Sequence, residues 1–284
     1  NSWYQRSETS GVHRGQEAYG AQLAYPNDRF DWYVDWRRIE INFNPALGFV
    51  NRSGVRQVDG QWRWRNRLDE GRWQWLGARL QYFRSDRLGG GLQSQSAYLN
   101  VLEGFSRSND FFTVFVGQQK EGLLQPFEIF EDIVIPADDY AFDRYGFYLE
   151  TGEHRTLSGT LEVVDGDFFG GSNLLIAPSL NWRPTRHFFA GLDYAVNRID
   201  LPPGEFHSRL YRLRANIAFN ADWAWLNFIQ GDNVSDTISI NSRLRWEPRP
   251  DREYFLVFNQ VLGRDGYDVL DTEVALKARF NIRF

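Results

Sequence analysis

Residues 273–284 read EVALKARFNIRF, and apolar and polar side chains alternate along the stretch. Because successive side chains of a β-strand point to opposite faces, the alternation predicts a strand with one apolar and one polar face. The apolar face comprises Val274, Leu276, Ala278, Phe280, Ile282 and Phe284, and the other face Glu273, Ala275, Lys277, Arg279, Asn281 and Arg283. Such a strand fits an outer-membrane β-barrel, with one face in hydrocarbon and the other in a polar lumen. An edge strand of a soluble β-sandwich is the alternative, and we favour the barrel because the pattern recurs along the chain.

Composition supports a membrane protein without transmembrane helices. The mean hydropathy is −0.51 and 24% of residues are charged, and no apolar run approaches the roughly 18–20 residues that a spanning helix needs. Aromatic residues nevertheless make up 17% of the chain, with 11 Trp, 13 Tyr and 23 Phe. Barrels concentrate such rings in two girdles at the membrane interfaces.

The residue types that the chain lacks and its net charge exclude several kinds of site and partner. The 284 residues include no cysteine, which excludes disulfide bonds and thiolate metal sites. Methionine is also absent, even at position 1, so we expect a mature product after removal of a secretory signal or a piece of a longer chain. The formal net charge of −5 is too small to imply a nucleic-acid partner.

Turn-forming residues divide the chain into about sixteen segments of alternating apolar and polar residues. The average length of these segments is close to the nine to eleven residues that a tilted membrane strand needs. Short turns are predicted at residues 26–29, 107–109, 184–186, 220–222 and 248–252, all at one end of the strands. Longer connections, at residues 44–54, 122–139, 165–172 and 263–272, fall at the other end. Bacterial barrels keep short turns in the periplasm and long loops outside. The fold class we predict is all-β: a transmembrane, antiparallel, up-and-down β-barrel of about sixteen strands, forming a single domain over residues 1–284.

The basic residues are expected to line the lumen, because an arginine facing lipid at the bilayer midplane costs roughly 2–4 kcal/mol. In residues 61–65 (QWRWR), for example, Trp62 and Trp64 then face lipid. The predicted lumen-lining residues that set selectivity are Arg63, Arg65, Arg79, Arg183, Arg212, Arg214, Arg243, Arg245, Lys277 and Arg279. Arg283 belongs to the same basic wall.

This wall has two interpretations. Unpaired guanidinium groups would raise the local anion concentration and favour anionic or hydroxyl-rich solutes. Alternatively, the arginines pair with carboxylates on neighbouring strands or inward-folded loops and stiffen a plugged barrel. The acidic connection at residues 127–143 (FEIFEDIVIPADDYAFD) is predicted to fold inward against the wall.

Two segments resist simple alternation. Phe30 to Trp36 and Ile39 to Phe43 place their apolar residues on opposite parities, which predicts a β-bulge near Arg37 and Arg38. Around Trp223 and Trp225 no phase is favoured.

Catalytic and metal-binding patterns are weak. None of the four histidines has metal-ligand spacing. We expect His154 and His187 at the periplasmic ends of strands and His13 and His207 near the outer rim, where His207 with Ser208 or His13 with Ser10 is a minor catalytic alternative. Two groups of acidic residues are a minor calcium alternative to solvated turns, namely Asp165 with Asp167, and Asp265, Asp268 and Asp271. We therefore predict no enzyme activity, no cofactor and no metal.

Three stretches are similar to one bacterial outer-membrane family of uncharacterised function, in which the barrel follows a family-nine-type carbohydrate-binding domain. They are residues 44–56 (NPALGFVNRSGVR), 136–146 (PADDYAFDRYG) and 279–284 (RFNIRF). The resemblance implies a surface role connected with glycans or export, and no established catalytic residues. The chain has no such carbohydrate-binding domain, and the family has further strands before its NPALGFV stretch. This chain would thus correspond to the C-terminal barrel part of a larger protein.

The function predicted from sequence is an outer-membrane channel or transport barrel for small polar or anionic solutes. The alternative is a plugged barrel that acts as a membrane anchor or as an export or surface-assembly component with a partner protein. The expected localisation is the bacterial outer membrane, the expected partners are the lipid bilayer, lipopolysaccharide and an outer-membrane protein or lipoprotein, and no nucleic acid is expected.

Overall fold

The computed structural model describes residues 1–45 and 48–281 of the chain. Within these residues the regular secondary structure is all β-strand, and sixteen strands form one antiparallel sheet in which neighbours in the chain are neighbours in space. The predicted strand number and up-and-down order are therefore confirmed. No helix in the described part has the length and apolar character required to cross a membrane.

The sheet has the order β1-β2-β3-β4-β5-β6-β7-β10-β11-β12-β13-β14-β15-β16-β17-β18. Its strands are β1 (Ser2–Arg6), β2 (Glu17–Tyr25), β3 (Phe30–Ile39), β4 (Val55–Arg67), β5 (Trp73–Arg87), β6 (Leu92–Ser106), β7 (Phe111–Gly122), β10 (Asp139–Glu150), β11 (Leu157–Phe168), β12 (Gly171–Thr185), β13 (Phe188–Leu201), β14 (Gly204–Ala218), β15 (Trp223–Asp232), β16 (Thr237–Arg249), β17 (Arg252–Gly263) and β18 (Val269–Phe280). A separate hairpin pairs β8 (Phe127–Phe130) with β9 (Ile133–Ile135).

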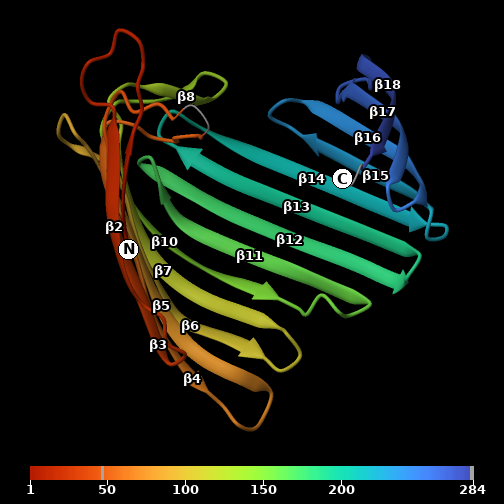
Figure 1. Ribbon diagram of the computed structural model, residues 1–284, viewed down its shortest axis with the longest axis horizontal. Helices are drawn as coiled ribbons and strands as arrows, with labels where there is room; N and C mark the ends of the chain where they lie inside the picture. Colours follow the sequence, from red (N-terminus) through yellow and green to blue (C-terminus); the bar gives the residue numbers. More distant parts are fainter. Residues whose placement is uncertain (46–47, 282–284) are drawn as a thin grey trace.

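The sheet curls into a trough but does not close. Figure 1 shows its first strands (red) and its last strands (blue) on opposite sides of the opening. β1 and β18 are the two edges and are not hydrogen-bonded to each other, so the closed barrel predicted from sequence is not what the structure shows. The edges are unequal, because β1 has 5 residues and β18 has 12, so β1 offers partners for only part of β18.

Connections differ between the two ends of the strands, as predicted. One end, which we call the turn end, carries residues 26–29, 68–72, 107–110, 151–156, 186–187, 219–222 and 250–251. The opposite loop end carries the longest connections, at residues 40–54 and 123–138. The predicted long connection at residues 165–172 is wrong, because β11 and β12 are joined by Phe169 and Gly170 alone. Both residues have positive φ, 46° and 82°, which is the geometry of a tight two-residue hairpin turn.

The strand register separates a concave face from a convex face. Arg63 pairs with Arg79 on the concave face, and the adjacent pair, Trp62 with Leu80, lies on the convex face. Side chains crowd on the concave face, where the Arg63 side chain is 24% exposed, whereas Leu80 is 40% exposed on the convex face. In β18 the apolar row predicted from sequence is convex and the charged row is concave as far as Phe280. Ile282, Arg283 and Phe284 lie outside the described residues.

Two uncertain strand phases are resolved by the register. β3 pairs with β2 and β4 without a shift, so the β-bulge predicted near Arg37 and Arg38 is wrong. The parity conflict has another cause: β3 ends at Ile39, which faces the concave side, and the apolar residues that follow belong to a loop. In β15, Trp223 and Trp225 pair with Trp246 and Leu244 on the convex face.

The β8–β9 hairpin lies over the concave face at the loop end of β13 and β14, near the top of Figure 1. Ile133 and Ile135 form a buried cluster with Ile199, Leu201 and Phe206. The ring of Phe130 stacks on that of Phe206 with centroids 4.5 Å apart. The connection therefore folds inward as predicted, but apolar packing holds it there rather than pairing with the basic wall.

Truncation of the hairpin's central side chain should release it. Ile135 is 1% exposed, so Ile135→Ala should cost the docked hairpin about 2–5 kcal/mol through lost packing. We expect faster hydrogen–deuterium exchange of amides 123–138 and unchanged exchange in β16 and β17. Val134→Ala is the control, since Val134 is 46% exposed. Equal exchange in the two variants would contradict an anchoring role for the Ile135 side chain.

Candidate functional site on the concave face

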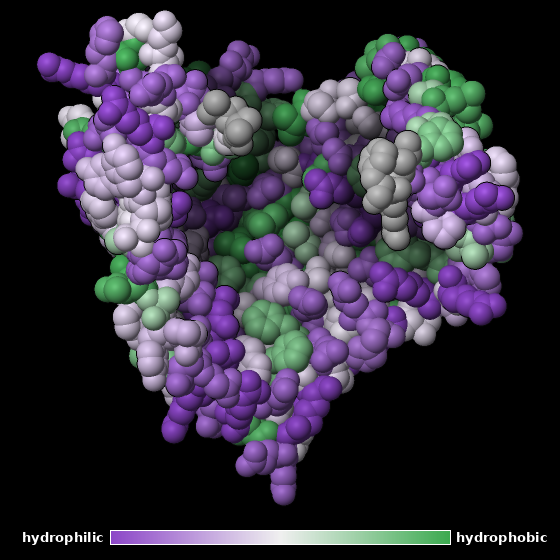
Figure 2. Space-filling model, in the orientation of Figure 1, coloured by the Kyte–Doolittle hydropathy of each residue, from purple (hydrophilic) through white to green (hydrophobic). Residues whose placement is uncertain are grey.

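All ten basic residues predicted to line a lumen lie on the concave face. The register places Arg212 opposite Asp193 and Gln230, and Arg243 opposite Leu226 and Val257. The same alternation puts the remaining members, Arg63, Arg65, Arg79, Arg183, Arg214, Arg245, Lys277 and Arg279, on this side. Figure 2 shows the hollow between the two walls of the trough, in which hydrophilic and hydrophobic residues are mixed.

Most of this basic charge is paired with carboxylates on the same or a nearby strand. Six of the ten make ion pairs. Arg63 and Arg79 reach Glu103 at 3.7 and 3.3 Å, Arg65 reaches Asp31 at 3.0 Å, Arg214 reaches Asp193 at 3.1 Å, Arg245 reaches Glu247 at 3.3 Å, and Arg279 reaches Glu253 at 3.5 Å. The pairing matches the structural interpretation of the arginines more closely than an array of free cations does.

The other four basic residues have no ion pair within the described part of the chain. Arg183 lies over the ring of Phe189, 5.0 Å from its centroid. Arg212 donates to Gln230 at 3.1 Å, and Arg243 donates to Asn241 at 2.7 Å. With Lys277, these side chains are the members of the predicted set whose positive charge has no ion-pair partner in the described residues.

Glu103 is the acidic centre of the wall, and sequence reasoning missed it. It is 1% exposed, and its carboxylate lies between Arg63 and Arg79. Asn100 adds its amide oxygen as an acceptor 2.6 Å from Nη2 of Arg79. A register shift between Asn100 and Leu102 turns Glu103 onto this face. The sequence feature that could have revealed Glu103 is the break in alternation in residues 99–103 (LNVLE), where Val101 and Leu102 are both apolar.

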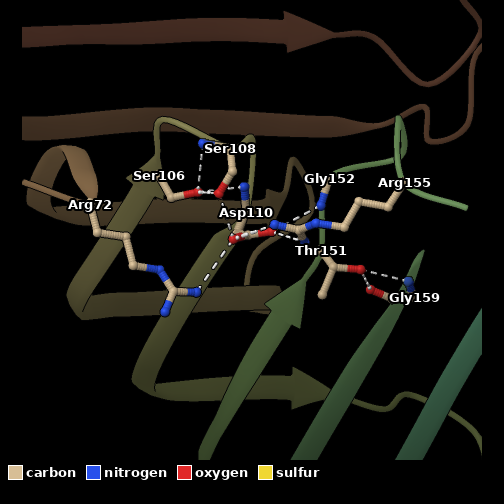
Figure 3. A network of polar contacts seen from close by, with 8 residues as sticks. All are labelled: Arg72, Ser106, Ser108, Asp110, Thr151, Gly152, Arg155 and Gly159. Carbon is tan, nitrogen blue, oxygen red and sulfur yellow. Dashed lines mark hydrogen bonds and ion pairs between the residues drawn. The ribbon is translucent and has the colours of Figure 1, made fainter. Parts of the chain in front are cut away.

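A second polar network ties three connections together at the turn end (Figure 3). Asp110 accepts two hydrogen bonds from the Arg155 guanidinium and one from Ser108, at 3.0 Å. It also accepts from the Gly152 amide at 3.1 Å and from Arg72 at 3.4 Å. The hydrogen bonds from Arg155, Gly152 and Ser108 hold the pKa of the Asp110 carboxyl well below its ordinary value, although burial opposes them. The network braces the turn end by joining its three connections.

In the described part of the chain, the positions of the residues do not support the minor catalytic and metal-binding alternatives. His207 and Ser208 are adjacent in β14 and so point to opposite faces of the sheet. His154 and His187 lie in turn-end connections, while His13 lies in the loop before β2, at the loop end. Asp165 accepts from the Tyr145 hydroxyl at 2.7 Å. Within residues 1–45 and 48–281 no group of three or more metal-binding side chains comes together.

Comparison with known proteins assigns neither a family nor a function to the chain. No protein-family model matches the chain, and no curated protein matches it. The geometry of the two faces of the sheet is therefore the basis on which we assign a function.

Removal of the Glu103 charge should destabilise the wall. Glu103→Gln leaves two partly buried arginines without their carboxylate, so we expect a loss of about 3 kcal/mol in the free energy of unfolding. Urea unfolding of the protein in micelles measures it. Glu153→Gln is the control, because Glu153 is exposed in a turn-end connection. Equal midpoints for the two variants would show that the buried pairs contribute nothing net.

The Asp110 network predicts a pH dependence of stability. Since the folded pKa lies below the unfolded value of about 4, the carboxylate's contribution is complete above that value and declines as the pH falls through the folded pKa. The stability difference between the natural protein and Asp110→Asn should be constant from pH 8 to 5 and shrink below pH 4. Asp69→Asn, in an exposed neighbouring turn, should show no such trend. A difference that grows on acidification would refute this role for Asp110.

Proposed function

We propose that the sheet closes through its two edges into a sixteen-stranded barrel in a bacterial outer membrane. The even number of antiparallel strands supports closure, because it makes β1 and β18 run in opposite directions. Closure also removes the exposed hydrogen-bonding edge of β18, which would otherwise be a template for aggregation. Most strands of the sheet have 12 or more residues, enough to cross a bilayer with a tilt.

The observation that carries the membrane proposal is the apolar convex face. Leucine, valine and tryptophan side chains on it are 40–48% exposed across the sheet, including Leu80, Leu99, Trp64, Val116, Leu180, Leu192, Leu213 and Leu256. An apolar surface of this extent is costly in water and is suited to lipid. Aromatic rings cluster toward the turn end of this face, as in Trp223, Trp246 and Tyr254, which contact one another in sequence.

The convex face becomes polar near the loop end. Arg84 and Asp86 form an ion pair there at 2.9 Å, and Arg38 and Glu40 form another at 2.8 Å. Charged pairs of this kind belong outside the hydrocarbon layer, so they mark one boundary of the proposed membrane-spanning band. The loop end then lies at the cell surface, because it carries the long connections.

Inside the barrel, the proposed function is a channel or transport barrel for small polar solutes. The concave wall has charged and amide side chains along its length, and such a wall stabilises water and polar solutes. The selectivity is carried by Arg183, Arg212, Arg243 and Lys277 rather than by all ten basic residues, since the other six are paired. The proposed pore is therefore only moderately selective for anions.

A second candidate function is a plugged anchor or an export component that works with a partner protein. Two observations favour it: the paired arginines stiffen the wall, and the β8–β9 hairpin covers part of the concave face. In that case the hollow would hold a protein segment instead of a solute.

Ion conductance tests the channel. In a planar bilayer we expect stable steps with a modest anion preference, and Arg212→Ser combined with Arg243→Ser should lower the anion-to-cation permeability ratio. Arg209→Ser is the matched control, because Arg209 lies on the convex face of the same strand as Arg212. Silence from a folded protein would contradict the channel and favour the plugged anchor. An equal effect of the control would show that the concave arginines do not set selectivity.

A further inference from the structure

Two aromatic rings on the concave face lie over glycines of the next strand. Tyr98 in β6 is the cross-strand partner of Gly117 in β7, and its ring occupies the space that a Cβ at Gly117 would fill. Phe115 in β7 is the partner of Gly146 in β10, and its Cζ would lie 2.8 Å from a Cβ there. Both glycines are in strand interiors, where glycine weakens the strand and often marks a close approach. The two ring centroids are 5.8 Å apart.

The rings form part of the lining of a hollow of about 520 Å³ over β5, β6, β7, β10 and β11. This size lies within the roughly 300–1,000 Å³ of typical ligand sites. Around the rings stand the polar side chains Arg79, Gln81, Asn100, Gln119, Arg144 and Glu162. A smaller hollow of about 210 Å³, which has Tyr148 and Glu162 in common with the first, extends toward β14.

Several of these polar side chains are available for a solute. In the part of the chain that the structure describes, Gln81, Gln119 and Glu162 make no side-chain hydrogen bond to the protein. Arg79 is different, because Glu103 compensates its charge. Arg144 makes no ion pair in the described residues, but the carboxylate of Glu162 lines the same hollow and offsets its charge. The hollow thus offers both hydrogen-bond donors and acceptors beside two aromatic rings, with no net excess of positive charge in its lining once Glu103 is counted.

We infer that this hollow is a saccharide-binding subsite, with Tyr98 and Phe115 as its apolar surface. A pyranose presents a face of C–H groups and a rim of hydroxyls that both donate and accept hydrogen bonds. The aromatic rings pack on the C–H face, while Gln81, Gln119 and Glu162 bind the rim. The inference specifies the solute class of the proposed channel and rests on that proposal for its place in transport.

Other solute classes fit the hollow less well. A small inorganic anion needs an excess of cations, whereas Arg79 is paired with Glu103 and the Glu162 carboxylate, which lines the hollow together with Arg144, would repel an anion. An apolar solute would leave the amides and the carboxylate desolvated without hydrogen-bond partners, which is unfavourable for each group. A saccharide satisfies both kinds of lining at once.

The chain provides a matched control for the rings. On the convex face Tyr211 in β14 is the cross-strand partner of Gly231 in β15, and its ring fills the Cβ space of that glycine. Tyr98→Leu and Tyr211→Leu therefore remove equivalent rings from opposite faces. Gly117→Ala and Gly231→Ala displace the same two rings without removing them.

Titration calorimetry of the full chain, folded in a detergent without a sugar headgroup, tests the inference with maltotriose, cellotriose and chitotriose as probes. We expect at least one trisaccharide to bind. Tyr98→Leu should weaken that binding about tenfold, in line with the 0.5–1.5 kcal/mol of an aromatic contact, and Tyr211→Leu should leave it unchanged. Gln119→Ala, which removes a polar group and no ring, should also weaken binding. It replaces Gly117→Ala as the second test of the hollow if that variant does not fold.

Three results would overturn the inference: no binding of any trisaccharide to the folded protein, equal weakening by Tyr98→Leu and Tyr211→Leu, or displacement of the sugar by phosphate at equal concentration. The experiment requires no open pore. Conductance without trisaccharide binding overturns the subsite alone, and binding without conductance overturns the channel alone.

Discussion

Continuous antiparallel register is the constraint on which the rest of the structure depends. Fifteen consecutive strand pairings keep alternate side chains on opposite faces, so each strand contributes one row to the convex face and one to the concave face. Where the register shifts, as between Asn100 and Leu102, the identity of the residue that points inward changes as well. The backbone pairing thus determines which side chains, and so which chemical groups, each face presents.

Charge balance on the concave face follows from the same constraint. Partly buried guanidinium groups are costly unless a carboxylate is near, and the register supplies one from an adjacent or nearby strand for Arg65, Arg214 and Arg279. The result is a wall in which six of the ten predicted basic residues have a carboxylate partner. In the proposed channel, such a wall would discriminate among solutes by the positions of its hydrogen-bonding groups more than by its overall charge, which agrees with the proposed hydroxyl-rich solute.

Local alternation allowed much of the fold to be predicted from sequence. In β18, β16 and β14 the apolar and basic residues have opposite parity, and the structure places them on opposite faces as expected. The contacts missed from sequence depend on residues far apart in the chain. The hairpin core joins Ile135 to Phe206, and the central carboxylate joins Glu103 to Arg63. Neither contact leaves a periodic pattern in the sequence. Alternation also cannot show whether the sheet closes into a barrel, because closure depends on the pairing of the two edge strands.

In the proposed arrangement the convex face lies in lipid and the concave face in water. Because the chain has no cysteine, a single cysteine introduced at each of residues 273–280 carries a unique nitroxide label. Paramagnetic relaxation by oxygen and by a water-soluble nickel complex should then be measured along β18 after reconstitution into vesicles. We expect two-residue periodicity, with labels at 274, 276, 278 and 280 accessible to oxygen and labels at 273, 275, 277 and 279 accessible to nickel. Uniform accessibility to nickel along the strand would contradict it.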